Sequence, residues 1–343
     1  MLVVAGAIAA AMPLQQLQQP VFRGRLETVA VPVTVFDPDQ SLVTSLTRED
    51  FTVLDNGARQ AITTFSSGLQ PIRAVVLVDT SASMTPVIDF ARVAAEQFVI
   101  RLRGDDLAMV GHFNVKVALS PEFTADRDAL LAWLRRDLSF SNPTRLLDAI
   151  DEAVTAVLPQ SGRRVVIVFT DGCDTASDTG WSRLLNRINS EDVMVYAVMF
   201  QPQIVAKPPP QQVISFGSAM GLPTGRGVGP LPPCTLHHYL ELKSGIPLAD
   251  FRKVDDPRWV RGADLVHQLA SETGGGRLRL TPADEINSMF TAVMNELHYL
   301  YLLGFSPQTL DGKVHELTVK LKDPTLVIRA RRHYLAPVPT GAK

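Results

Sequence analysis

Hydrophobic residues along the middle of the chain follow two spacings, one typical of buried strands and one typical of amphipathic helices. Short runs rich in Val, Ile and Leu predict strands, and most of them are followed by a longer stretch with helical spacing. Strands are expected at Ala74–Val78, Leu107–Phe113, Val115–Leu119, Val165–Phe169, Val193–Met199 and Arg277–Leu280. Helices are expected at Pro86–Leu102, Asp126–Arg136, Arg145–Leu158, Trp181–Asn189, Ala263–Thr273 and Asp284–Tyr299.

This alternation predicts an α/β fold of the Rossmann-like, doubly wound kind, in which helices cover both faces of a mostly parallel sheet. One pair of strands departs from the rule. Only Asn114 separates Leu107–Phe113 from Val115–Leu119, which leaves room for a hairpin and for nothing longer. We therefore expect one antiparallel edge strand in the sheet.

Both ends of the chain show the two-residue period of strands. Four valines alternate with other residues between positions 29 and 35, and Asp55-Asn56-Gly57 is a strong hairpin signal. Near the other end, Val314–Leu321 and Leu326–Ala330 form a second pair. Because an isolated hairpin is marginal in water, we expect the two ends to combine into one small β-sandwich-like domain.

These patterns predict how the chain is divided. Residues 201–260 interrupt the alternation, because their many Pro and Gly residues cannot build regular structure. Such a long segment is expected to be a functional lid, a partner-binding insert or an excursion without a role. The expected parts are a signal-peptide remnant and linker (1–20), the first half of the β domain (21–70), the α/β domain with its insert (71–304), the second half of the β domain (305–336) and a tail (337–343).

Polar residues stand where the predicted buried strands end. Asp79 follows one strand and precedes Ser81 and Ser83, Asp171 follows another, and Thr144 lies just before a predicted helix. Open α/β sheets bind ligands at the carboxyl ends of their strands. Carboxylate and hydroxyl oxygens suit a hard divalent cation better than they suit zinc. The alternative is that these five are ordinary turn and cap residues.

The order and spacing of these residues decide between the two interpretations. Asp-x-Ser-x-Ser at 79–83, a Thr before Leu-Asp-Ala-Ile at 147–150, and Thr-Asp-Gly at 170–172 together resemble the metal-ion-dependent adhesion site of the von Willebrand factor type A domain. The resemblance implies that Ser81, Ser83 and Thr144 coordinate the ion, and that Asp79 and Asp171 bind it directly or through water. It also implies Mg²⁺, with Mn²⁺ or Ca²⁺ as alternatives, and a position left open for an Asp or Glu carboxylate of a protein partner.

The resemblance extends beyond this site. Thr28–Phe65 and the segments Leu269–Leu280, Leu297–Pro307 and Leu317–Tyr334 are similar to an exported bacterial group related to von Willebrand factor type A proteins and abundant in acidobacteria. Residues 1–11 are apolar and end in small residues, as the tail of a secretory signal peptide does, although a short buried helix is the alternative. We therefore expect export to the periplasm, the cell surface or the medium. No stretch is long and apolar enough to predict a transmembrane helix.

The charge of the chain excludes two classes of partner but does not point to a new function. The formal net charge is −2, and no long basic run occurs, so neither nucleic acid nor an anionic membrane surface is expected as a partner. Arg329, Arg331 and Arg332 form a local basic cluster, which we interpret as the solvated face of a strand.

The chain has only two cysteines, Cys173 and Cys234. In an exported protein they could form one disulfide, which would stabilise the fold by about 4 kcal/mol, or remain two thiols. Cys234 with His237 and His238 has part of the spacing of a zinc site but lacks a fourth ligand nearby.

The expected function is binding rather than catalysis, as an adhesion or scaffold protein. The sequence has no Gly-x-x-x-x-Gly-Lys-Ser/Thr loop and no Gly-x-Ser-x-Gly elbow. His112 could act as a base for Ser81 or Ser83, but we expect a structural role for it. The alternative function is a metal-assisted hydrolase that acts on an ester or phosphoester at the same site.

Overall fold

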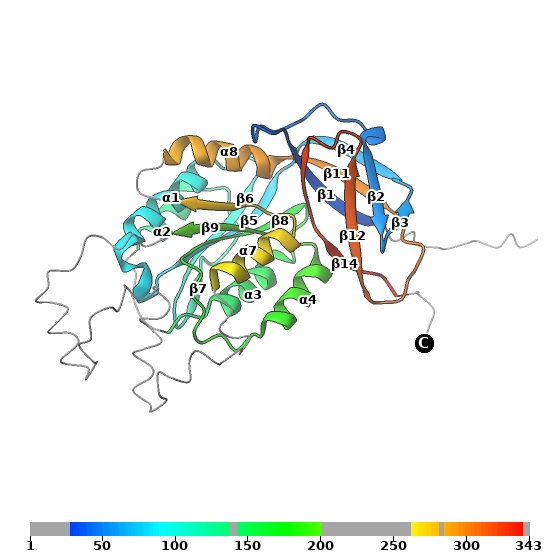
Figure 1. Cartoon of the computed structure of the whole chain (residues 1–343). Coiled ribbons are helices and arrows are strands. Elements are labelled where there is room, and N and C mark those ends of the chain that lie inside the picture. Colours follow the sequence, from blue (N-terminus) through cyan, green and yellow to red (C-terminus); the bar gives the residue numbers. More distant parts are fainter. Residues whose placement is uncertain (1–27, 137–142, 201–261, 281–284, 339–343) are drawn as a thin grey trace, which may run out of the picture.

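The structure is a computed structural model that describes residues 28–136, 143–200, 262–280 and 285–338. Figure 1 shows two units side by side, a larger one of helices and strands and a smaller one of strands.

A six-stranded sheet in the order β10-β9-β8-β5-β6-β7 forms the middle of the larger unit. Five neighbouring strands pair in parallel, and β7 pairs antiparallel with β6 at one edge. The predicted α/β fold with one antiparallel edge strand is therefore confirmed. The strands are β5 (Ile72–Asp79), β6 (Leu107–Phe113), β7 (Val117–Leu119), β8 (Arg163–Thr170), β9 (Met194–Phe200) and β10 (Arg277–Leu280).

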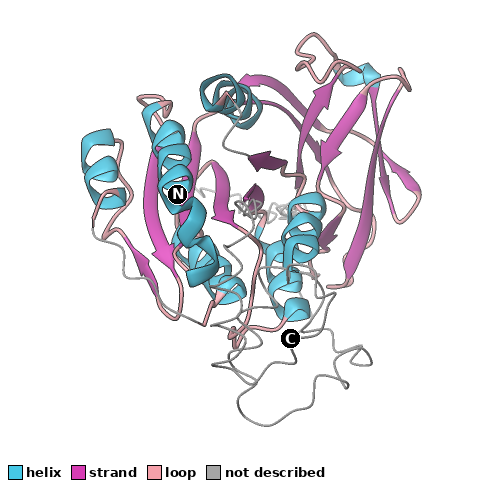
Figure 2. Ribbon diagram, turned by 60° about the vertical axis from the view of Figure 1, so that its left-hand side comes forward, coloured by secondary structure: helices cyan, strands magenta, loops and turns pink. Residues whose placement is uncertain are grey.

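Helices cover both faces of this sheet, as Figure 2 shows. Successive side chains of a strand point to opposite faces, so Val76 and Val78 of β5 pack towards α1, α2 and α8, whereas Val75 and Leu77 pack towards α3, α4 and α7. The helices are α1 (Ile88–Ile100), α2 (Arg127–Leu134), α3 (Leu146–Val157), α4 (Trp181–Glu191), α7 (Gly262–Glu272) and α8 (Ile286–His298).

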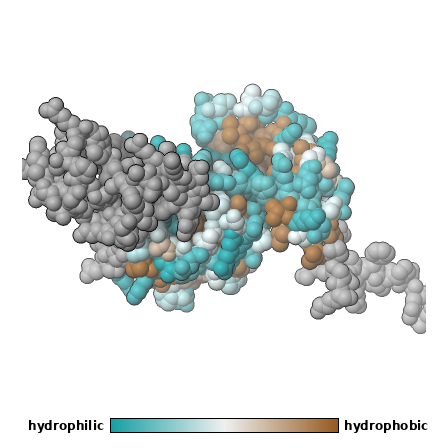
Figure 3. All heavy atoms as spheres, turned by 60° about the horizontal axis from the view of Figure 1, so that its bottom comes forward, coloured by the Kyte–Doolittle hydropathy of each residue, from teal (hydrophilic) through white to brown (hydrophobic). Residues whose placement is uncertain are grey.

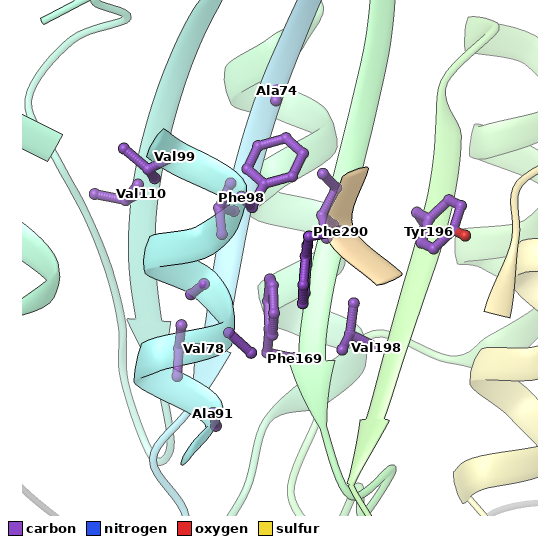
Figure 4. Close-up of a cluster of buried hydrophobic side chains, with 14 of the residues drawn as sticks. Ala74, Val78, Ala91, Phe98, Val99, Val110, Phe169, Tyr196, Val198 and Phe290 are labelled. Carbon is purple, nitrogen blue, oxygen red and sulfur yellow. The ribbon is translucent and has the colours of Figure 1, made fainter. Parts of the chain in front are cut away.

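Aromatic side chains fill much of the first of these two layers (Figure 4). Phe169 of β8 and Phe290 of α8 stack with their ring centroids 6.0 Å apart, and Phe98 of α1 is fully buried in the same cluster. Burying a side chain of this size contributes about 1.5–3 kcal/mol. This layer therefore holds the sheet rigid beneath the carboxyl ends of its strands.

The smaller unit consists of two antiparallel sheets, in the orders β13-β1-β11-β4 and β14-β12-β2-β3. Their inner faces share one apolar core, in which Tyr301 of the first sheet and Phe51 of the second lie with ring centroids 5.1 Å apart. The predicted β-sandwich-like arrangement of the two chain ends is confirmed. The strands are β1 (Val29–Phe36), β2 (Phe51–Asp55), β3 (Ala58–Gln60), β4 (Thr64–Leu69), β11 (Tyr299–Phe305), β12 (Val314–Leu321), β13 (Val327–Ala330) and β14 (His333–Leu335).

Strand β11 differs from what the sequence led us to expect. It follows α8 without a break and lies between β1 and β4, so residues 299–305 belong to the smaller unit, although we assigned residues up to 304 to the α/β domain. A central strand buried on both faces reads as a continuous apolar run, which periodicity cannot separate from the end of a buried helix.

The start of α1 also differs from its prediction. A 3₁₀ helix, η2 (Ala82–Val87), precedes α1 and contains Pro86, which was expected to open the α-helix itself. The chain therefore makes a tight turn between β5 and α1, and Ser81 and Ser83 lie on it.

The surface is mostly hydrophilic on the face shown in Figure 3, with apolar side chains gathered in a few patches. Within the described ranges, no helix combines the length and the apolar character needed to cross a bilayer.

Candidate metal centre

Two of the five candidate residues lie at the ends of neighbouring central strands. Val78 of β5 pairs with Phe169 of β8, so the residues that follow them, Asp79 and Thr170, are also neighbours. The Thr170 hydroxyl donates a hydrogen bond of 2.6 Å to Asp79 Oδ2. Asp171 directly follows β8, and its carboxylate is close enough to Asp79 to act on the pKa of that residue. The parallel register therefore brings two carboxylates to the same edge of the sheet.

The turn after β5 brings the two serines to these carboxylates. The Ser81 amide donates to Asp79 Oδ1 at 2.9 Å, and the Ser81 and Ser83 hydroxyl oxygens lie 3.0 Å apart. Asp79 and Ser81 are fully buried, and Ser83 is half-buried. The hydrogen bond from residue 81 to residue 79 is an Asx turn, which fixes the two hydroxyls relative to the carboxylate.

Thr144 is held by the loop that follows Asp171. Its amide donates to Thr175 Oγ1 at 2.8 Å, while the amides of Thr175 and Ala176 donate to its carbonyl oxygen at 2.9 and 3.0 Å. Only 1% of Thr144 is exposed. These bonds place residue 144 beside the segment that begins with Asp171.

Several residues that support this centre were missed by the sequence analysis. The Asn114 side-chain amide donates to Thr80 Oγ1 at 3.1 Å, and the Thr80 hydroxyl donates to the carbonyl oxygen of Phe113 at 3.1 Å. The Arg145 amide donates to the carbonyl oxygen of Asn114 at 2.9 Å. These contacts join the turn after β5, the hairpin after β6 and the start of α3. In sequence, Thr80 and Asn114 are only polar residues next to strands, and nothing marks their partners.

Two acidic residues anchor the loop after β8 to the start of α3. Asp174 Oδ1 accepts hydrogen bonds from the amide of Leu146 at 2.8 Å and from the Ser177 hydroxyl at 2.6 Å. Asp148 accepts from the amide of Thr179 at 2.8 Å and from the guanidinium of Arg145 at 2.6 Å. The first turn of a helix has unpaired amides, which Asp174 satisfies from another segment.

Burial makes both carboxylates of the centre weak acids. Burial and, to a smaller extent, the neighbouring Asp171 carboxylate together raise the pKa of Asp79 to about 7, against hydrogen bonds from Thr170 and Ser81. Burial also raises the pKa of Asp171, against hydrogen bonds from Ser83 and the Cys173 amide. Like charges close together in a buried site oppose each other's ionisation. When both carboxylates are ionised, a bound cation would compensate their negative charge.

One carboxylate oxygen of this centre has no hydrogen-bond partner in the described part of the chain. Asp171 Oδ1 accepts a hydrogen bond from the Cys173 amide at 3.0 Å, but Asp171 Oδ2 is buried and has no hydrogen-bond partner among the described residues. A buried polar atom without a partner is costly unless water or an ion satisfies it.

The donor set fits a hard divalent cation. It consists of carboxylate and hydroxyl oxygens, the ligands preferred by Mg²⁺ and Ca²⁺, and it lacks the nitrogen and sulfur that zinc prefers. In the part of the chain that the structure describes, no group of three or more His, Cys, Asp or Glu residues could hold a metal ion. The candidate centre therefore depends on its hydroxyl groups.

Other candidates lie elsewhere or outside the described residues. The ring of His112 packs against Trp133 of α2, with centroids 5.0 Å apart, and burial lowers the pKa of His112. This packing fits the structural role expected for it. Cys173 is buried beside Asp171, but Cys234 and the insert at 201–260 lie outside the described residues, so the disulfide stays a prediction. The same holds for the zinc site considered at Cys234, His237 and His238.

Comparison with known proteins finds a family match within the larger unit. Residues 74–173 match the family model of the von Willebrand factor type A domain. A search of curated proteins finds no significant match.

Similar solved structures include two proteins from Bacteroides and one from a mussel. An aerotolerance-related membrane protein from Bacteroides fragilis has 15% identity and a TM-score of 0.42 over 66% of this chain and 98% of its own. BatB from Bacteroides thetaiotaomicron has 15% identity and a TM-score of 0.43 over 66% and 97%. Proximal thread matrix protein 1 from the mussel byssus, with a zinc-occupied MIDAS motif, has 12% identity and a TM-score of 0.44 over 69% and 49%.

Proposed function

From the von Willebrand factor type A domain that the chain contains, we propose that the protein binds other proteins through a divalent cation at this centre. Ser81, Ser83 and Thr144 coordinate the ion, which is Mg²⁺ in this proposal, and Asp79 and Asp171 bind it directly or through water. A partner protein donates an Asp or Glu carboxylate to the open position. The protein is exported and works as an adhesion or scaffold protein in the periplasm, at the cell surface or outside the cell.

The observation that carries this proposal concerns Asp171 Oδ2. It is buried beside a second carboxylate and has no hydrogen-bond partner among the residues that the structure describes. Leaving a charged group buried and unpaired costs several kcal/mol. No cationic side chain of the described residues forms an ion pair with Asp171, and the Arg145 guanidinium is paired with Asp148 and Asp178. A divalent ion would satisfy the free oxygen and reverse the mutual repulsion of Asp79 and Asp171.

The choice of an acidic partner follows from the ligands. The hydroxyl oxygens of Ser81, Ser83 and Thr144 are neutral. They therefore neutralise less of the positive charge of the ion than carboxylates in direct contact would. When bound, the ion supplies positive charge at the edge of the sheet. A hard cation with neutral ligands and a free position binds a carboxylate well.

Metal binding is tested by calorimetric titration with Mg²⁺ or Mn²⁺. The wild-type protein should bind one ion, and Asp79→Ala with Ser81→Ala should abolish binding while circular dichroism stays unchanged. Asp37→Ala with Ser41→Ala is a matched control, because the Ser41 amide donates to Asp37 Oδ1 at 2.8 Å in an exposed turn of the β domain. Equal binding by wild type and a folded Asp79/Ser81 variant would remove the proposal.

Partner binding is tested by affinity capture from an envelope extract, with and without EDTA. We expect that wild type and the Asp37/Ser41 control recover a partner protein. The Asp79/Ser81 variant should not recover it, and neither should wild type in the presence of EDTA. Equal recovery of the partner with and without EDTA, and by wild type and the Asp79/Ser81 variant, would contradict a metal-dependent contact. Metal-dependent turnover of model esters or phosphoesters, lost in the Asp79/Ser81 variant, would replace binding by the hydrolase alternative.

A further inference from the structure

A pocket of about 300 Å³ lies where the two units meet. One wall is the turn from α7 to β10, and the other is strand β13 and the residues that follow it. In Figure 1, α7 lies beside the red strands of the smaller unit. The turn precedes β10, so the pocket opens at the amino-terminal edge of the parallel sheet, opposite to Asp79 and Asp171.

The walls of this pocket are fixed by three consecutive glycines. Gly274 has φ +74°, and a Cβ atom there would lie 2.7 Å from the carbonyl carbon of Ala330. A Cβ atom on Gly275 would lie 1.9 Å from the carbonyl oxygen of Val195 in β9. Only glycine allows the backbone to approach so closely on both sides. A β-bridge between Thr273 and Arg331 then joins the two walls, so the pocket is held in one shape.

Among the described residues, the ionisable side chains that line the pocket are all basic: His267, Arg277, Arg329 and Arg332. Arg329 is already satisfied, since its guanidinium bonds Glu296 Oε1 at 2.5 Å. Arg277 and Arg332 are exposed, and neither forms an ion pair with a described residue. The pocket therefore keeps the positive charge of two guanidinium groups.

Two acidic residues near the junction form ion pairs with residues other than Arg277 and Arg332. Glu272 bonds the His333 ring at 2.7 Å, and Asp192 bonds the Arg331 guanidinium at 3.3 Å. This also corrects the interpretation of the basic cluster as a solvated strand face. Arg331 is largely buried and Arg329 half-buried at the junction, where β13 packs against the larger unit, and Arg332 alone of the three is exposed.

We propose that this junction pocket binds a small molecule that carries an oxyanion, either a carboxylate or a phosphate, through Arg277 and Arg332. The planar guanidinium donates two parallel hydrogen bonds to such a group. A volume of about 300 Å³ is at the small end of ligand pockets, which occur often between domains. This inference goes beyond the proposed function and does not depend on the cation.

The test is calorimetric titration of the full chain with inorganic phosphate and, separately, with citrate, in buffers matched for ionic strength with NaCl. Wild type should bind at least one of the two saturably, which also tells phosphate from carboxylate recognition. Arg277→Gln with Arg332→Gln should weaken that binding at least tenfold, because charge-assisted hydrogen bonds are lost. Arg48→Gln with Arg59→Gln removes two exposed arginines of the β domain and should leave binding unchanged.

Three results would overturn the proposal. They are no saturable binding of either anion by wild type, equal binding by wild type and the Arg277/Arg332 variant, and an equal loss in the Arg48/Arg59 control. The single variant Arg277→Gln serves if the double variant does not fold, and a threefold or greater loss is expected for it. The same variants are also titrated with Mg²⁺, which tests the metal centre at the other edge of the sheet. Their Mg²⁺ affinity should equal that of wild type.

Discussion

Replacing Asp79 by Asn should stabilise the metal-free protein while removing its metal site. Burial and the Asp171 carboxylate raise the pKa of Asp79 from its ordinary value of 3.8 to about 7. Each pKa unit corresponds to 1.36 kcal/mol, so ionised Asp79 destabilises the folded state by about 4 kcal/mol above pH 7. Asn carries no charge and avoids this cost.

The hydrogen bonds of Asp79 reduce the expected gain. Asn can still accept from the Ser81 amide, but its NH₂ group would face the Thr170 hydroxyl, which now donates to Asp79 Oδ2 and accepts from the Gly172 amide. The loss of one such bond costs about 1 kcal/mol. The net stabilisation expected for Asp79→Asn is therefore about 3 kcal/mol at pH 8.

The effect has a defined pH dependence. A carboxyl whose pKa is raised by folding contributes its full stability below the unfolded pKa of 3.8 and loses it as the pH rises through about 7. The difference between Asn and wild type should therefore favour Asn by a growing amount from pH 4 to pH 7 and remain constant above that. Below pH 4 the Asn variant should be slightly less stable than wild type.

The assay is urea unfolding in EDTA at several pH values, followed by tryptophan fluorescence. Two of the three tryptophans, Trp133 and Trp181, lie on α2 and α4, so their part of the signal reports the α/β unit. Asp148→Asn is the matched control with the opposite sign: despite burial, hydrogen bonds from Thr179, Asp178 and Arg145 lower the pKa of Asp148, so this variant should lose about 1–3 kcal/mol at pH 8. An Asp79→Asn variant that is less stable than wild type at pH 8, or a difference that ignores pH, would refute the reasoning.

Three further predictions follow from other parts of the molecule. The Mg²⁺ affinity of wild type should rise between pH 6 and pH 8, because the ion competes with protons for Asp79 and Asp171, whose pKa values burial raises. A constant affinity in calorimetry over this range would count against these ligands. Gly275→Ala should destabilise the protein by several kcal/mol in urea unfolding, since its Cβ atom would lie 1.9 Å from the Val195 carbonyl oxygen, whereas Gly104→Ala, with nothing within 4 Å, should be nearly neutral. Removing residues 306–343 deletes β12 and β13, the partners of β2 and β1, so amide hydrogen exchange in 28–65 should speed up; unaltered protection would mean that the two ends are independent.

The parts of the fold that the sequence predicted are those where periodicity is strong and local. The parallel strands are short β-branched runs, and the helices between them keep one apolar face, so the elements of the sheet were placed to within a few residues. Strand β11 was missed because its apolar run continues directly from α8. Arg329 and Arg331 were misread because strand alternation does not reveal that a second unit covers that face.

The same limit applies to the candidate centre. Asp79, Ser81, Ser83, Thr144 and Asp171 could be named because they follow strands or precede a helix in a recognisable order. The supporting contacts of Thr170, Asn114 and Asp174 depend on which strands are neighbours and on the register between them, and one sequence does not contain this information.

The most direct test of the metal centre is a crystal structure of the protein grown with Mn²⁺, with anomalous diffraction data. We expect one anomalous peak at the carboxyl ends of β5 and β8, with the hydroxyl oxygens of Ser81, Ser83 and Thr144 as ligands and Asp171 Oδ2 facing the ion or one of its waters. The peak should be absent from crystals of Asp79→Ala with Ser81→Ala. A wild-type map without a peak there, or with water alone bonded to Asp171 Oδ2, would contradict the central claim.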